Sequence, residues 1–277
     1  MKKILVPVDF SEQATFACKV AASIARKTKS EIILLHMLDV PSTSVDPAET
    51  SNLRGGAQTI FYMKSIHKRF AEFKSQPFFE GIKVMEHVKF HKAFEGVIEE
   101  SKKNDVDLIV MGSQGATGLK EMLVGSNTEK VVRQSHIPVL VIKQNIDNFD
   151  IKHLIFASDF GEQSRTSFQK VINFAKIFDA RIHLLFINTV RNFETTRTTE
   201  EKFKNFIRGF ELTNYTTNIF NDVTIEEGIL NFGRRINADL IAINTHGRSG
   251  LYNLFTESIS KDLANHALRP VITFKIA

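Results

Sequence analysis

The stretch of sequence that decides the fold is 107–134, DLIVMGSQGATGLKEMLVGSNTEKVVRQ. It opens with an apolar run from Leu108 to Met111 that is typical of a buried strand. A glycine-rich segment follows, and a helical pattern begins near Ser126. Backbone N–H groups at a helix N-terminus bind phosphate when glycines let the chain come close. The stretch therefore predicts a strand, an anion-binding loop and a new helix.

The composition is that of a soluble globular protein, with 43% hydrophobic and 24% charged residues among 277. A single cysteine, Cys18, excludes an internal disulfide framework and suits a reducing compartment. The formal charge of +5 is mild, and the basic residues are scattered among acids, which favours a solvated surface over nucleic-acid binding. The first segment, MKKILVPVDF, has an apolar part that is too short for a signal peptide and that charged residues soon follow. No run approaches the ~18 apolar residues of a membrane span. We expect a cytoplasmic protein.

Strands alternate with helices along the first half of the chain. The expected strands are 3–8, 31–38, 83–90, 108–111 and 138–143, and the expected helices are 12–27, 58–74, 93–103 and a segment from 126. The polar segment 41–56 predicts a loop. This alternation indicates right-handed βαβ units and a parallel sheet with helices on both faces. Ligands bind such sheets beyond the carboxyl ends of the strands, where Asp9 and Gly112 are expected.

Three histidines of the first half are candidates to bind a ligand such as a metal ion. His36 lies within a strand pattern, and we expect it to pack on the sheet. His87 and His91 have i, i+4 spacing, which suits a metal only when both lie on one helix. A junction between a strand and a helix is expected between them, and no third ligand is near in sequence. We therefore interpret both as surface histidines.

The second half of the chain repeats the first. KHLIFASDF at 152–160 matches KKILVPVDF at 2–10, so that Asp159 follows Asp9 by 150 positions. ADLIAINTHGRSGL at 238–251 matches VDLIVMGSQGATGL at 106–119, now 132 positions apart. The repeat predicts two α/β units, 1–145 and 150–277. The final apolar strands of the two units, 138–143 and 270–275, are natural pairing edges and predict an internal pseudo-dimer.

Taken together, these residues resemble the universal stress protein family in its tandem two-domain form, over nearly the whole chain. The family's nucleotide motif, G-x2-G-x9-G-[ST], is met by Gly112, Gly115, Gly125 and Ser126. Neither GxxxxGK[ST] nor GxGxxG is present, which disfavours the other common nucleotide folds. The resemblance implies two tandem domains like the adenine-nucleotide alpha hydrolases. Each would hold a Rossmann-like, five-stranded parallel sheet with helices on both faces.

The resemblance also implies an ATP site in the first domain, with or without Mg²⁺. The Asp9 carboxylate would accept from a ribose hydroxyl, a backbone group near Met37 would meet the adenine edge, and Ser126 would bind phosphate. The implied ligand-binding residues are Pro7, Asp9, Met37, Met111, Gly112, Gly115, Gly125, Ser126 and Asn127. Two simpler interpretations stay open: Asp9 caps the first helix, or the glycines serve only a tight turn.

The second unit departs from the motif at two positions. Asn244 stands where the first unit has Gly112, and Glu257 stands in place of Gly125. We expect the Cβ of Asn244 to crowd the close approach of the backbone to a ligand. A carboxylate about 4 Å from a phosphate in a partly screened site is repelled by about 4 kcal/mol. We therefore expect a degenerate second site and interpret His246 as a loop residue, with a role near a ligand left open.

The leading hypothesis is a stress-response protein that binds ATP, or a related adenine nucleotide, in its first domain and acts as a nucleotide-dependent regulatory or interaction module. Hydrolysis would be slow at most, because the sequence places no general base and no pair of acids for Mg²⁺ beyond Asp9. No catalytic residue is assigned. The alternatives are a structural module that binds no nucleotide and an adenylate-forming enzyme of the same superfamily. A homodimer is left open, no membrane partner is expected, and no protein partner is identified.

Overall fold

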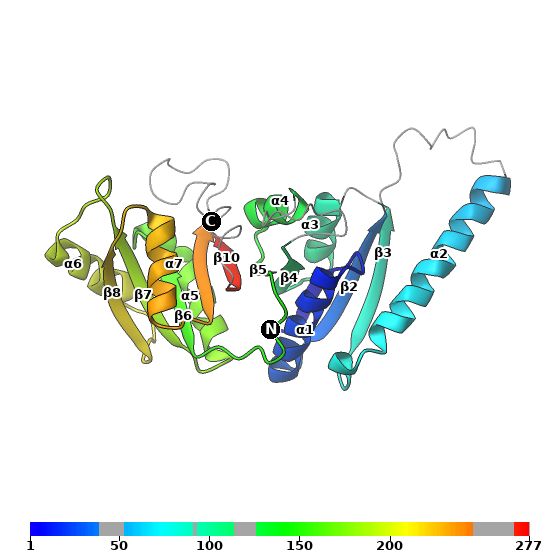
Figure 1. The fold of residues 1–277 in the computed structure, drawn as a ribbon, viewed down its shortest axis with the longest axis horizontal. Helices are drawn as coiled ribbons and strands as arrows, with labels where there is room; N and C mark the ends of the chain where they lie inside the picture. Colours follow the sequence, from blue (N-terminus) through cyan, green and yellow to red (C-terminus); the bar gives the residue numbers. More distant parts are fainter. Residues whose placement is uncertain (39–52, 91–92, 114–125, 246–268, 277) are drawn as a thin grey trace.

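The first half of the chain folds as alternating strands and helices (Figure 1). The computed structural model describes residues 1–38, 53–90, 93–113, 126–245 and 269–276. The strands of this half are β1 (Lys3–Pro7), β2 (Glu31–Leu38), β3 (Val84–Phe90), β4 (Leu108–Gly112) and β5 (Val139–Ile142). The helices are α1 (Glu12–Thr28), α2 (Leu53–Lys74), α3 (Ala93–Lys103) and α4 (Ser126–Gln134).

The second half follows the same plan, as the repeat predicts. Its strands are β6 (His153–Ala157), β7 (Arg181–Asn188), β8 (Tyr215–Asn221), β9 (Leu240–Thr245) and β10 (Val271–Lys275). Its helices within the described residues are α5 (Glu162–Lys176), α6 (Thr196–Ile207) and α7 (Ile225–Arg235). None of the helices in the described ranges is long and apolar enough to cross a bilayer.

The start of α2 differs from the expectation. The helix begins at Leu53, inside the segment 41–56 that we expected to be a loop, and contains Gly55 and Gly56. A glycine costs a helix only about 1 kcal/mol relative to alanine, so the helical pattern that follows outweighs the pair. The remainder of the expected loop, 39–52, lies outside the described residues.

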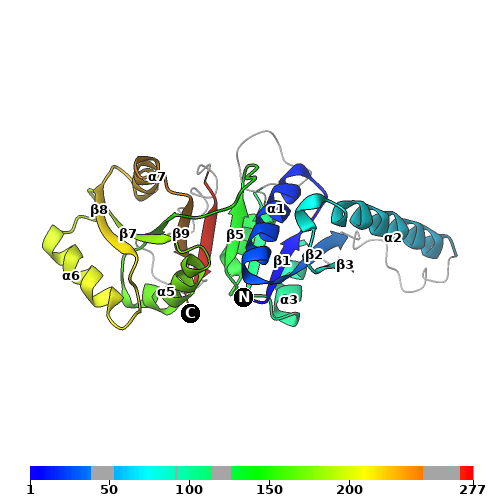
Figure 2. The same cartoon turned by 90° about the horizontal axis from the view of Figure 1, so that it is seen from below.

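All ten strands join one sheet in the order β3-β2-β1-β4-β5-β10-β9-β6-β7-β8. Strands pair in parallel within each half. β5 and β10 lie side by side at the centre (Figure 2) and pair antiparallel, with Val271 opposite Val141 and Ile272 opposite Leu140. The expected pairing of the two terminal strands is confirmed.

Helices cover both faces of the sheet. On one face, α1, α2, α5 and α6 enclose an apolar cluster that runs through both halves. On the other face, α3 and α4 cover the first half and α7 covers the second. Phenylalanine dominates the shared cluster because the chain has 24 Phe and no Trp. The largest side chains that are fully buried are Phe70, Phe156, Phe168, Phe186, Phe206 and Phe274.

A buried histidine on β7 couples the fold of the second half to pH. His183 is 7% exposed, and its Nδ1 lies 2.8 Å from the Thr216 hydroxyl. Its Nε2 lies 3.1 Å from Nδ1 of His153. Burial, and then the positive charges of His153 and Arg181, lower the pKa of His183 to about 4. His183 is therefore neutral in the folded protein at neutral pH.

The stability of the protein should fall as the pH drops from about 6.5 toward 4. In this range the unfolded chain binds a proton at His183 that the folded chain does not bind, so protonation favours unfolding. Urea unfolding of the wild type between pH 7.5 and 5 should therefore lose about 2 kcal/mol more than that of His183→Gln. Equal losses in the two proteins would contradict the assignment.

The seam between β5 and β10 should carry much of the stability of the chain. Ile272 is fully buried there opposite Leu140, so Ile272→Ala should cost about 2–5 kcal/mol in urea unfolding. Val190→Ala is the control, because Val190 is 94% exposed and should change stability by less than about 0.5 kcal/mol. A cost for Ile272→Ala as small as that of the control would show that the pairing contributes little.

Candidate functional site

A tight turn after β1 fixes the position of Asp9. The backbone N–H of Val8 donates to the carbonyl of Leu35 at 2.8 Å and extends the β1–β2 pairing by one residue. Phe10 then adopts a left-handed backbone with φ of 64°, which is unfavourable for a bulky L-residue. The Asp9 Oδ1 accepts the backbone N–H of Ser11 at 3.0 Å. This strained turn holds Asp9 at the carboxyl edge of the sheet.

Aromatic packing holds the turn in place. His36 Nδ1–H donates to the carbonyl of Val8 at 2.7 Å, and its ring lies 5.0 Å from that of Phe10. Phe10 also meets Phe70 edge-on at 5.1 Å, and the guanidinium of Arg69 lies 4.3 Å from its ring centroid. The expectation that His36 packs on the sheet is confirmed. Its role in bracing the Asp9 turn was not predicted, because the strand pattern does not show which carbonyl the ring meets.

Ser11, not Asp9, caps the first helix. The Ser11 side chain accepts the backbone N–H of Ala14 at 3.2 Å, as expected for an N-cap. Asp9 lies two residues before this cap and supports it through the N–H of Ser11. The simpler interpretation of Asp9 as the cap of α1 is therefore wrong.

The end of β4 lies against α1 and is tied to α4. A Cβ at Gly112 would lie 2.9 Å from backbone atoms of Gln13, so the close approach of α1 requires glycine. The carbonyl of Gly112 accepts the Thr128 hydroxyl at 3.0 Å. Thr128 is buried in the first turn of α4, and its bond holds the helix N-terminus at the end of β4. Thr128 was not predicted, although its place two residues after Ser126 was a usable signal.

The strand register brings most of the predicted site residues to one edge. β1 pairs with β4 through Ile4–Leu108 and Leu5–Ile109, and continuing this register places Met111 level with Pro7. The β1–β2 register places Met37 level with Asp9 in the same way. Among the described residues, this edge collects Pro7, Asp9, Met37, Met111, Gly112, Ser126 and Asn127. Gly115 and Gly125 lie outside the described residues.

This edge combines two kinds of binding group. Asp9 provides a carboxylate beside β1, and the first turn of α4 provides backbone N–H groups with the exposed Ser126 and Asn127. The helix dipole favours an anion at that turn. Neighbouring strands are about 4.8 Å apart, so one small molecule can reach both elements. The arrangement suits a ligand with hydroxyls at one end and an anionic group at the other.

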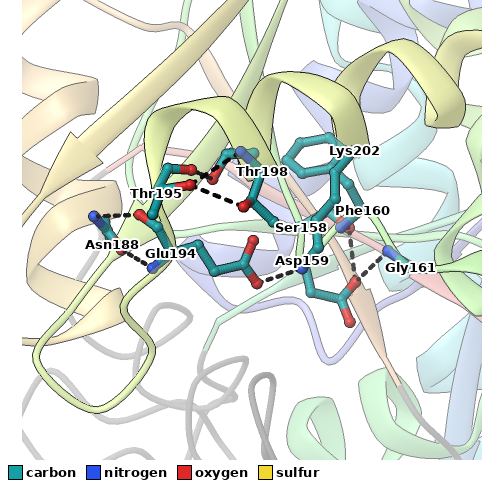
Figure 3. Close-up of polar contacts among 10 residues, drawn as sticks. Ser158, Asp159, Phe160, Gly161, Asn188, Glu194, Thr195, Thr198 and Lys202 are labelled. Carbon is teal, nitrogen blue, oxygen red and sulfur yellow. Dashed lines mark hydrogen bonds and ion pairs between the residues drawn. The ribbon is translucent and has the colours of Figure 1, made fainter.

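The matching turn in the second half is built more firmly around its aspartate (Figure 3). Phe160 has a φ of 58°, as Phe10 has in the first half. Asp159 Oδ1 accepts the N–H of Gly161 at 3.1 Å and the hydroxyls of Ser164 and Ser158 at 2.9 and 3.3 Å. The first half has Ala14 and Val8 at the two serine positions. Asp159 is therefore held by two serine hydroxyls that have no counterpart at positions 8 and 14 of the first half.

The loop after β7 adds a second carboxylate beside this turn. The Asn188 side chain bonds both backbone groups of Glu194: its Oδ1 accepts the N–H at 2.8 Å and its Nδ2 donates to the carbonyl at 3.3 Å. The Glu194 carboxylate pairs with Lys202 of α6. Figure 3 shows both side chains directed toward the turn that contains Asp159. An ion pair of the chain itself thus lies at the second edge.

Asn244 takes the place of Gly112 in the second half. It pairs with Phe274 on β10, as Gly112 pairs with Ile142 on β5. Its side chain is buried, and Oδ1 accepts the Ser167 hydroxyl of α5 at 2.7 Å. The polar end of this side chain is thus bonded to α5, and the expectation that the Cβ of Asn244 crowds a ligand stays a prediction. His246 and Glu257 lie outside the described residues.

His87 lies partly at the surface, with 27% of its side chain exposed, and it pairs with a buried acid, which was not predicted. Its Nδ1 lies 3.0 Å from Oε2 of Glu100, whose side chain is 5% exposed, and Lys89 Nζ lies 3.1 Å from Oε1. Burial alone would raise the pKa of Glu100, but the hydrogen bonds from His87 and Lys89 lower it overall. His91 lies outside the described residues. In the part of the chain that the structure describes, no group of three His, Cys, Asp or Glu side chains could hold a metal ion.

Comparison with known proteins finds relatives that match about half of this chain. Universal stress protein MJ0577 of Methanocaldococcus jannaschii is 33% identical over 158 residues, covering 52% of this chain and 95% of that protein. Universal stress protein YxiE of Bacillus subtilis is 32% identical over 157 residues, covering 51% of this chain and 98% of that protein. Each of these proteins thus corresponds to about half of this chain.

The tandem arrangement also has a solved counterpart. The crystal structure of a universal stress protein from Archaeoglobus fulgidus covers 99% of this chain and 98% of its own, with a TM-score of 0.74 and 22% identity. That likeness shows the same fold through both halves. The Universal stress protein family model matches residues 1–143 and 218–275, well over half of the sequence. The chain belongs to the universal stress protein family.

Proposed function

We propose that the first half of the chain binds an adenine nucleotide, with ATP as the first candidate, and acts in the cytoplasm as a nucleotide-dependent regulatory or interaction module. One observation carries the proposal: the Thr128–Gly112 hydrogen bond holds the N-terminus of α4 on the same sheet edge as Asp9. The Asp9 carboxylate and the anion-binding first turn of α4 then lie within reach of one nucleotide. The complete family motif in this half supports the same ligand.

Each part of the edge has a role in this proposal. Asp9 accepts a ribose hydroxyl, Pro7 and Met37 lie at the adenine end, and Met111 and Gly112 follow the sugar. Ser126 and Asn127, with Gly115 and Gly125, bind the phosphates through backbone N–H groups and the serine hydroxyl. One carboxylate is a poor Mg²⁺ site without phosphate oxygens, so any Mg²⁺ arrives with the nucleotide. Hydrolysis is slow at most, since no group is assigned as a general base.

The two units, with proposed boundaries 1–145 and 150–277, have different roles in this proposal. The second half serves as the structural or regulatory partner and binds no triphosphate in the same way. Asp159 Oδ1 already accepts three donors, and the Glu194–Lys202 pair lies beside that turn. A homodimer of whole chains is not required, because β5 already pairs with β10 within the chain.

Gly125→Glu, which copies Glu257 into the first half, should weaken ATP binding at least about fivefold. The added carboxylate repels the phosphates by about 1–4 kcal/mol. Isothermal titration calorimetry at fixed salt measures the effect. Adenosine, which has no phosphate, should bind the variant and the wild type equally, and the melting temperature without nucleotide should not change. Unchanged ATP affinity, or no ATP uptake by the wild type at millimolar concentration, would favour the structural module that binds no nucleotide.

Asp9→Asn should lower ATP affinity about tenfold, because a charge-assisted hydrogen bond is worth about 1.5–3 kcal/mol. The amide oxygen can still accept the N–H of Ser11, so the turn is kept. The matched control is Asp159→Asn, which should leave ATP affinity within about twofold. Binding of 2′,3′-dideoxy-ATP isolates the ribose contact: the wild type should prefer ATP, and Asp9→Asn should lose that preference. Equal losses in the two variants would argue against a ribose contact at Asp9.

A further inference from the structure

A cavity of about 380 Å³ lies where the two halves meet, and the proposed nucleotide site does not include it. Its walls come from segments 106–108 and 136–138, from one side of α5, and from Phe274 of β10. The two first-half segments precede β4 and β5, at the strand ends opposite to Asp9 and Gly112. The volume falls within the range of small-molecule sites, roughly 300–1,000 Å³.

One stripe of α5 forms a wall of this seam cavity. Lys170, Asn173, Phe174 and Ile177 follow i, i+3, i+4, i+7 spacing, which places them on one side of the helix. Phe174 is 4% exposed and Phe274 is 1% exposed, so aromatic carbon lines the inner part of the cavity. Lys170 and Asn173 are exposed and lie on the same stripe. The cavity therefore has an apolar interior with a polar, cationic border.

Positive charge gathers at that border. Lys275 Nζ donates to the carbonyl of Gln134 at 3.2 Å and lies 3.4 Å from His136 Nε2. Burial, followed by the charges of Lys275, Lys102 and Lys170, lowers the pKa of His136. Burial, followed by Lys102, lowers the pKa of Lys275. The lysine charges are the smaller cause of both shifts, after burial, and they alone favour a negative charge nearby.

The acid that lines the cavity is engaged elsewhere. Asp107 Oδ2 accepts the backbone N–H groups of Lys2 and Lys3 at 2.5 and 3.0 Å. These bonds hold its carboxylate against the start of β1. Within the described residues Lys170 makes no ion pair, so its ammonium group can pair with an anion at the border.

The corresponding surface of α1, in the first half, shows which chemical groups can cover such a helix face. The repeat aligns the α5 stripe with Val20, Ser23, Ile24 and Lys27 of α1. That surface is covered by the linker between the halves: the Ser23 hydroxyl donates to the carbonyl of Phe149 at 3.1 Å, and Lys27 Nζ lies 3.1 Å from Asp150 Oδ1. Phe149 is 3% exposed. The linker thus covers this face of α1 with the buried residue Phe149 and with the Asp150 carboxylate, where the α5 counterpart lines a cavity.

We propose that the seam cavity binds a small organic anion: a carboxylate whose apolar body lies against Phe174 and Phe274 and whose charged end meets Lys170 and His136. The ligand combines an apolar group with a carboxylate, as the linker does with Phe149 and Asp150, but its cation is Lys170 and not the counterpart of Lys27, which is Ile177. Because it touches both halves, it stabilises their association by mass action. The proposal does not depend on nucleotide binding.

Octanoate is the probe, and its binding to the full chain is measured by calorimetry and by the shift of the melting temperature. Octanoate should bind in the millimolar range or tighter, octanol more weakly, and octylammonium not detectably. Lys170→Glu should lower octanoate affinity at least about tenfold. Lys176→Glu makes the same charge change on α5 outside the cavity wall, and should change it less than about twofold.

Asn173→Trp provides an independent test, because the exposed Asn173 lines the cavity and an indole there would fill it. This variant should lose octanoate binding while it keeps its affinity for ATP and its far-UV circular dichroism. No octanoate uptake by the wild type at about 10 mM would overturn the proposal. Equal binding of octanoate and octylammonium, or equal losses in Lys170→Glu and Lys176→Glu, would overturn it as well.

Discussion

The antiparallel pairing of β5 with β10 is the interaction on which the rest of the structure depends. It joins two five-stranded parallel sheets into one and buries Leu140 and Ile272 completely. Without it, each half would expose an apolar edge strand that invites another chain. The pairing also lets one apolar cluster extend through both halves. Because the strands of the two halves run in opposite directions, the carboxyl edges of the halves lie at opposite ends of the β5–β10 pair.

This pseudo-symmetric frame carries two edges that have diverged in chemistry. Both keep an aspartate followed by a left-handed phenylalanine, so the turn itself is the shared element. The second half adds Ser158 and Ser164 around its aspartate, and Ser167 to receive Asn244. These hydroxyls replace apolar residues of the first half and donate hydrogen bonds to Asp159 and Asn244. The proposed nucleotide site is placed in the first half because that half keeps the complete family motif.

The seam has diverged as well, for a topological reason. A linker must leave β5 to reach β6, and it covers α1 with Phe149 and Asp150 on the way. The matching stripe on α5 faces the cavity, with lysines at its border. A tandem protein can therefore carry a surface between its halves that a pair of separate, identical units would not have.

Sequence alone determined the order of elements, the repeat and the edge that carries Asp9 and Gly112, because these follow from local periodicity and from the geometry of parallel strands. It misplaced the start of α2, since a weak glycine penalty does not set a helix boundary. Only the tertiary structure shows the roles of His36, His87 and Thr128. It also shows that Gly112 lies against the backbone of Gln13. Each depends on a hydrogen bond or a close contact between segments far apart in the chain. Local patterns place a residue on an element, but they do not specify which distant atom it meets.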